Sequence, residues 1–124
     1  MVVRDQLIEM HAGTSHTMGF TIVDAAGAAK SLADLTFTFA IARLTSDGVI
    51  VTASPPVDLS SVAESAQFTV VDESGGLLDV ELLVADTSGL DGDYAFQCEA
   101  TDGSSNPVMV SEGTYRAWRN IANA

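Results

Sequence analysis

The stretch LTFTFAIAR, residues 35–43, alternates large apolar side chains with small or polar ones. In an extended strand successive side chains point to opposite faces, so this period of two predicts a strand with one buried face. The buried face should carry the odd-numbered residues Leu35, Phe37, Phe39 and Ile41. The preceding stretch SHTMGFTIV, residues 15–23, alternates in the same way, with its even-numbered residues apolar. These two stretches predict a protein built from sheets.

The rest of the chain continues this pattern of short alternating segments separated by turn residues. Further strands are predicted at 7–11, 49–53, 66–72, 77–84, 94–101 and from 108 to about 118. About seven to eight strands at this spacing favour an all-β fold, a single antiparallel immunoglobulin-like β-sandwich with one short helical turn. We expect one domain over 1–124, with 1–6 and 119–124 as possible arms. Residues 54–65 carry two of the three prolines and predict a crossing connection or an edge.

Composition narrows the classes of partner. Of the 124 residues 47% are hydrophobic and 18% charged, which suits a sheet protein with a real core. The formal net charge of −12 argues against nucleic acid and anionic membranes as partners. No apolar run approaches the roughly 20 residues that span a bilayer, and no secretory signal is visible, so we expect synthesis in a cytoplasm. The single cysteine, Cys98, excludes an internal disulfide.

The acidic stretch ADTSGLDGDYAFQCEATDG, residues 85–103, is predicted to be a corner of the sandwich. Asp86 is a candidate N-cap for a helical turn that Gly89 could end. Tyr94 then begins a strand, with its ring packed inward and its hydroxyl bonded back to nearby backbone, as in the penultimate strand of immunoglobulin-like sandwiches. Cys98 on the same face is expected to be a buried apolar residue.

Two other sets of residues suggest alternative sites. Calcium could draw oxygen ligands from a set of loop carboxylates, namely Asp86, Asp91, Asp93 and Asp102, although their spacing fits no known calcium loop. His11 and His16 lie near serine and threonine, but neither a third zinc ligand nor a G-x-S-x-G elbow accompanies them. His16 has the parity of the inward face of 15–23, which favours a hydrogen-bonded core residue. We therefore assign no catalytic residue, metal ligand or cofactor, and expect no enzyme activity.

The composition of residues 113–120 suggests a role in docking to a partner protein. In GTYRAWRN, residues 113–120, two arginines flank the only tryptophan of an otherwise acidic chain. Arginine and tryptophan are enriched where proteins anchor to proteins, so Arg116, Trp118 and Arg119 are predicted partner-docking residues. The alternative is a final edge strand whose long side chains lie over the sheet.

The order of motifs is also informative: GTSHTMGFTIVDAAG, then LADLTFTFAIAR, then GGLLDVELLVADTSGLDGDYAFQCEATDG, and a last VSEGTYRAW. This order resembles the small immunoglobulin-like modules of tailed-bacteriophage virions, including the amino-terminal domain of baseplate upper proteins. The resemblance covers about 13–117 and implies a virion component without catalytic residues, whose partners are phage capsid or tail structural proteins.

Baseplate relatives carry the module at the head of a longer protein, whereas this chain stops soon after its last strand. We therefore expect a capsid cement or decoration protein, present on the particle in many copies or as a homo-oligomer. A baseplate or tail module, and a calcium- or carbohydrate-binding sandwich, remain alternatives. The expected location is the virion, after synthesis in the host cytoplasm.

Overall fold

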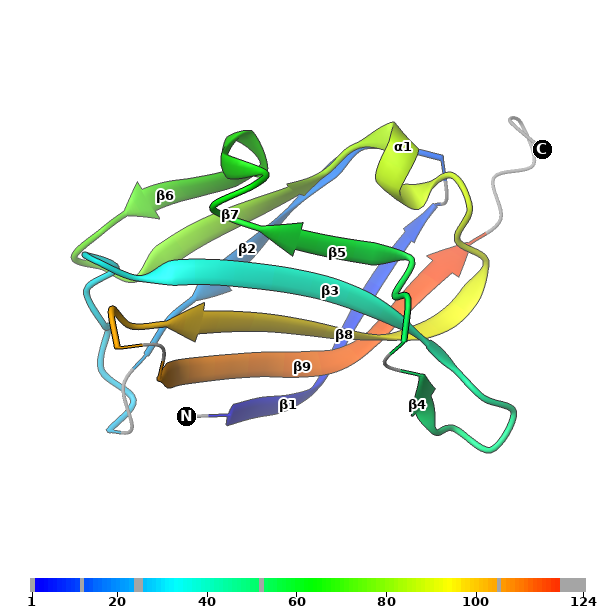
Figure 1. The fold of residues 1–124 in the computed structure, drawn as a ribbon, viewed down its shortest axis with the longest axis horizontal. Coiled ribbons are helices and arrows are strands. Elements are labelled where there is room, and N and C mark those ends of the chain that lie inside the picture. Colours follow the sequence, from blue (N-terminus) through cyan, green and yellow to red (C-terminus); the bar gives the residue numbers. More distant parts are fainter. Residues whose placement is uncertain (1, 12, 24–25, 52, 105, 119–124) are drawn as a thin grey trace.

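The computed structural model describes residues 2–11, 13–23, 26–51, 53–104 and 106–118, which form two β-sheets packed face to face (Figure 1). The described elements, in chain order, are β1 (Val2–His11), β2 (His16–Thr21), β3 (Thr36–Leu44), β4 (Ile50–Val51), β5 (Val57–Ser60), a 3-10 turn (Ser65–Gln67), β6 (Phe68–Asp72), β7 (Leu77–Leu82), α1 (Val84–Thr87), β8 (Gly92–Thr101) and β9 (Pro107–Trp118). No helix in these ranges has the length and apolarity to cross a bilayer.

The sheet order is that of an immunoglobulin domain. The small sheet has the order β2-β7-β6, and the large sheet has the order β1-β9-β8-β3-β4, with β5 also paired to β3. In immunoglobulin sandwiches the second, fifth and fourth strands form one sheet, while the third, sixth and seventh form the other. Here β2, β7 and β6 correspond to the first sheet, and β3, β8 and β9 correspond to the second. The strands β4 and β5 are additional and lie between β3 and β6 in the chain. The predicted immunoglobulin-like β-sandwich is therefore confirmed.

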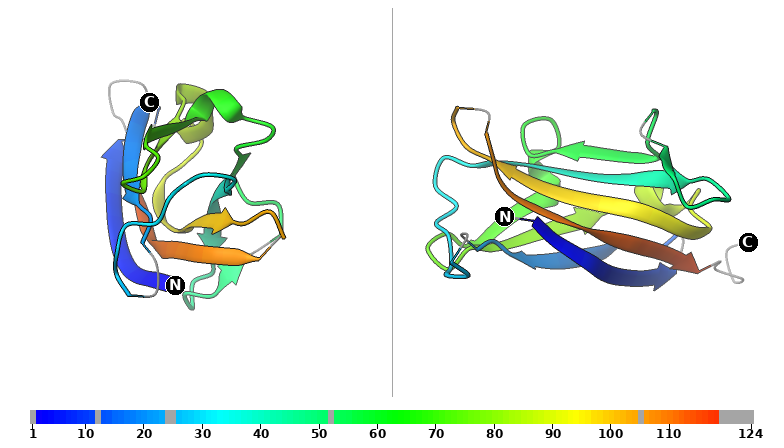
Figure 2. Two further views of the ribbon diagram at one scale, coloured as in Figure 1. Left: turned by 90° about the vertical axis from the view of Figure 1, so that its left-hand side faces the viewer. Right: turned by 90° about the horizontal axis from the view of Figure 1, so that it is seen from below.

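One pairing departs from the antiparallel prediction. Strand β1 runs parallel to β9, while the other strand pairs are antiparallel (Figure 2). This pairing includes Val2 and Val3, so residues 2–6 belong to the sheet and are not an arm. The other possible arm, 119–124, lies outside the described residues. The alternation in 2–6 is too weak to mark a strand, because its pairing with β9 is set by contacts distant in sequence.

The core lies between the inward faces of the two sheets. Phe39 and Ile41 are fully buried, and the inward face predicted for 35–43 is confirmed. The rings of Phe20, Phe39 and Phe96 meet across the sandwich with centroids 6.1 to 6.5 Å apart. Burying one such side chain stabilises a fold by about 1.5–3 kcal/mol, so this aromatic cluster fixes the small sheet on the large one.

The proline-rich stretch 54–65 shows which of its two predicted uses applies. It contains β5, a four-residue strand that pairs with β3 at the margin of the large sheet. Val57 and Leu59 of β5 are buried, whereas the prolines precede the strand and leave its backbone hydrogen bonds intact. The stretch is thus an edge, and the described fold has nine strands rather than eight.

Candidate functional site

The acidic corner between β7 and β8 has the structural use predicted for it. The hydroxyl of Tyr94 accepts a hydrogen bond of 3.0 Å from the backbone N–H of Asp91. The half-buried ring packs against the core at the start of β8. This arrangement is a tyrosine corner, which holds the turn into the penultimate strand of an immunoglobulin-like sandwich.

The helical turn before this corner begins earlier than predicted. The N-cap of α1 is Leu83, and Asp86 lies three residues into the helix. From there the Asp86 carboxylate accepts the backbone N–H of Leu83 at 2.9 Å and the side-chain amide of Gln67 at 2.9 Å. Asp86 therefore satisfies an unpaired donor at the helix start by reaching backward, which is the second half of a capping box.

The remaining acidic residues of the stretch do not gather at one point. Asp93 forms an ion pair with Arg116, with N to O distances of 2.8 and 3.3 Å, and this pairing lowers the pKa of Asp93. Asp102 lies beyond the opposite end of the ten-residue β8, where it accepts the backbone N–H groups of Ser104 and Asn106. In the described ranges no group of three or more histidine, cysteine, aspartate or glutamate side chains is placed to hold a metal ion. The calcium hypothesis thus loses its proposed ligand set.

His16 connects the two sheets. Its Nε2 lies 2.7 Å from the hydroxyl of Tyr115 on β9, and the two rings stack with centroids 5.9 Å apart. Its Nδ1 is buried and has no hydrogen-bond partner among the described residues, so the charged ring would leave a buried N–H unsatisfied there. Burial lowers the pKa of His16 and raises the pKa of Tyr115 to about 12. The prediction of a hydrogen-bonded residue on the inward face is confirmed, whereas the side chain of His11 lies outside the described structure.

Cys98 is buried between the sheets, 2% exposed, as predicted. Burial raises the pKa of its thiol to about 12. Because the thiolate is the nucleophilic form, this cysteine behaves as a core residue.

Two of the three predicted docking residues are described, and both lie on the outward face of the large sheet. Trp118 is 49% exposed, and its Nε1 donates to a carboxylate oxygen of Glu9 on β1 at 3.1 Å. Arg116 is held against the same face by Asp93. The edge position of the alternative is wrong, because β9 lies between β8 and β1. Its other part holds, since the long side chains of Arg116 and Trp118 reach across the sheet to Asp93 and Glu9 of the neighbouring strands. Arg119 lies outside the described residues.

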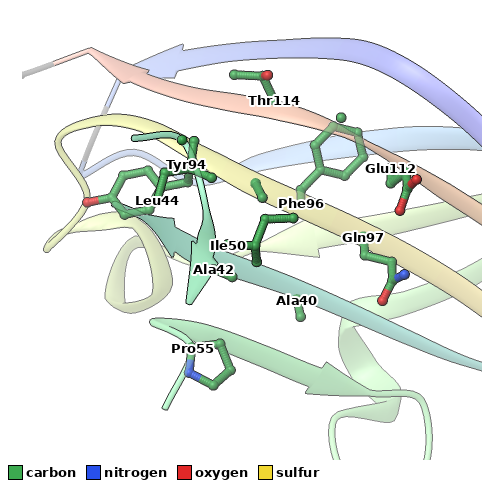
Figure 3. Close-up of a pocket in the computed structure, with 13 residues that line it drawn as sticks. Ala40, Ala42, Leu44, Ile50, Pro55, Tyr94, Phe96, Gln97, Glu112 and Thr114 are labelled. Carbon is green, nitrogen blue, oxygen red and sulfur yellow. The ribbon is translucent and has the colours of Figure 1, made fainter. Parts of the chain in front are cut away.

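A pocket continues this outward face toward β4, and the sequence did not predict it. Its cavity volume is about 620 Å³. Figure 3 shows Thr114 and Glu112 of β9 on one side and Pro55 on the other, with Ala40 and Ala42 of β3 between them. A signal was present in the sequence, since alanine is depleted in strands yet recurs at outward positions 40, 42 and 95.

Comparison with known proteins gives likeness in structure only. No protein-family model and no curated protein matches the sequence. The first immunoglobulin domain of the mouse polymeric immunoglobulin receptor superposes with a TM-score of 0.49 at 9% identity, covering 94% of this chain and 92% of that chain. The N-terminal Ig1-2 module of the Drosophila receptor protein tyrosine phosphatase DLAR gives 0.43 at 15% identity, covering 95% of this chain and 46% of that chain. Tim-1 gives 0.37 at 11% identity, covering 94% and 92%. The fold assignment rests on the sheet order described above.

Proposed function

We propose that this chain is a structural protein of a tailed-bacteriophage particle, a capsid cement or decoration protein that docks on the lattice and stabilises it. The observation that carries the proposal is the outward face of the large sheet, where Trp118 lies half exposed at one end and a largely apolar pocket lies at the other. The order of sequence motifs supports the phage assignment, and the acidic corner supports a non-catalytic role because its polar groups hold the fold together.

Docking would use Trp118 as an apolar anchor and Arg116 as a directed donor at its side, with Arg119 as the third predicted contact. Trp118 is already oriented by its hydrogen bond to Glu9, so little side-chain freedom is lost on binding. A decoration protein binds in many copies, and modest interfaces repeated over a lattice can then stabilise the whole particle.

The test is the location of the chain in particles of the phage that encodes it. Heads and tails are separated after controlled disassembly, and the chain is quantified in each fraction by mass spectrometry against the major capsid protein. We expect it in the head fraction at a fixed ratio to the capsid subunit. Its recovery in the tail fraction would favour the baseplate or tail alternative, and its absence from purified particles would refute the proposal.

A matched pair of variants tests the docking residues. Trp118→Ala should lower the amount bound to particles, because it removes the exposed anchor. Val62→Ala is the control, since Val62 is 78% exposed, lies in the turn after β5 and does not line the pocket. Equal loss in both variants would count against an anchor role for Trp118.

A further inference from the structure

The pocket on the outward face of the large sheet has a floor of small side chains. Ala42 pairs directly with Ala95, and Ala95 pairs with Thr114, so these three residues form one row across β3, β8 and β9. Ala40 adds a second small side chain on the same face of β3. Strands usually favour β-branched or aromatic residues, so the half-buried Ala42 and Ala95 depart from local preference. Such departures are expected at functional sites.

Larger apolar residues stand at one side of this floor. Ile50 of β4 is 53% exposed, and Pro55 lies in the segment leading to β5. The floor lets a partner's side chains approach the sheet closely, while Ile50 and Pro55 offer apolar area against which they can pack (Figure 3). The pocket therefore suits an element that inserts apolar side chains, and its size exceeds that of a single side chain.

The charges around the pocket are mainly acidic. Glu112 lines the pocket, and Asp58 lies opposite Ala40 in the pairing of β5 with β3. The exception is Arg43, whose guanidinium donates to the Ser54 carbonyl beside Pro55 at 3.1 Å. The nearby guanidinium of Arg116 is already engaged by Asp93. The chain as a whole carries a formal charge of −12, so a second copy placed face to face would meet strong repulsion. Charge complementarity instead selects a partner with basic side chains beside its apolar ones.

We propose, on the basis of the function proposed above, that this pocket binds a segment of the capsid subunit that carries both apolar and basic side chains. Trp118 then lies at one end of a continuous docking face, and the pocket between β9 and β4 lies at the other. The element inserts apolar side chains over Ala42 and Ala95, while its lysine or arginine side chains meet Glu112 and Asp58.

The probe is a particle assembled without this chain, to which purified protein is added back and bound copies are counted at increasing protein concentration. Ala95→Arg places a long cation on the pocket floor, so it blocks insertion and repels a basic partner. Thr36→Arg is the matched control, because Thr36 is exposed on the outward face of the same sheet and does not line the pocket. Melting temperatures of both variants establish that each is folded.

We expect Ala95→Arg to bind at least about tenfold more weakly than the wild type, and Thr36→Arg to bind within about threefold of it. Binding of the wild type should weaken as salt is raised, since rim charges are screened. Equal binding by wild type and Ala95→Arg, or binding insensitive to salt, would overturn the pocket proposal and leave the virion assignment standing. Failure of the wild type to bind such particles would overturn both.

The oligomeric state tests whether a second copy of this chain, and not the capsid subunit, occupies the pocket. Sedimentation of the wild type at rising concentration should show a monomer. A dimer that Ala95→Arg dissociates and Thr36→Arg preserves would show that the pocket is covered by another copy of this chain, which contradicts the proposal.

Discussion

Replacing Tyr94 with phenylalanine tests whether the acidic corner is scaffold or site. The change keeps the ring and removes only the hydroxyl, which accepts one hydrogen bond from the Asp91 backbone. A hydrogen bond of this kind contributes about 0.5–1.5 kcal/mol to stability. The Asp91 residue is exposed, so water can satisfy its N–H after the change, and the loss should fall in the lower half of that range. For a domain of 124 residues the melting temperature should fall by about 2–4 °C.

Tyr115→Phe provides the matched comparison, because the same atom is removed at a buried position. Tyr115 is 1% exposed, and its hydroxyl is the partner of His16 Nε2. Removing it leaves both ring nitrogens of His16 without a hydrogen-bond partner in the described part of the chain, and an unsatisfied buried group costs about 1–3 kcal/mol. The melting temperature should fall by about 4–12 °C, clearly more than for Tyr94→Phe.

The assay is thermal and urea unfolding of the three proteins, followed by circular dichroism, together with the particle-binding measurement. Both variants should keep an unchanged denaturant slope and bind particles as the wild type does when folded. The scaffold interpretation fails if Tyr94→Phe melts with the wild type but loses particle binding. It also fails if the hydroxyl at the exposed corner proves more stabilising than the buried one.

Three further outcomes follow from the structure. Burial lowers the pKa of His16 below its ordinary 6.5, so the unfolded state binds more protons than the folded state below that pH. The free energy of unfolding should therefore decrease as the pH falls from about 6.5. Urea titrations between pH 7 and 5 should show a smaller decrease for His16→Gln. Gly76→Ala should destabilise the protein by at least about 1 kcal/mol more than Gly48→Ala. Both glycines have positive φ, but of the two only Gly76 is placed where a Cβ would collide with the Ile22 carbonyl oxygen. Equal melting temperatures of the two variants would contradict this. Cys98 should resist thiol reagents in the native protein and react on unfolding, and stoichiometric native labelling would show that its burial is wrong.

The sheets were predictable from sequence wherever one face is buried, and less so elsewhere. The strand at 35–43 is predictable because its alternating residues Phe37, Phe39 and Ile41 are all buried in the same core. In β5 the strand is only four residues long and follows two prolines, so local pattern and pairing disagree. Its pairing with β3 is decided by the burial of Val57 and Leu59 against the rest of the core.

The candidate site was less predictable, because it depends on which strands become neighbours. Trp118 and the arginines were recognisable by residue type, since they are unusual on an acidic chain. The pocket was not, because Ala42 and Ala95 are 53 positions apart in number and meet only through the register of β3 with β8. A residue pair of this kind carries no local signal beyond the choice of alanine at an outward-facing strand position.

The outward face of the large sheet therefore combines two features that serve different ends. Its charged row places Arg116 between Glu9 and Asp93 in adjacent strands, which aligns β1, β9 and β8. Its neighbouring row of small side chains adds little to the sheet, because alanine offers little area for cross-strand packing and is depleted in strands. Stability alone would place threonine, valine or a charged residue there, as β3 does at Thr36 and Thr38. The docking proposal accounts for alanine at these positions, because an apolar element of the proposed partner could rest close to the strands there.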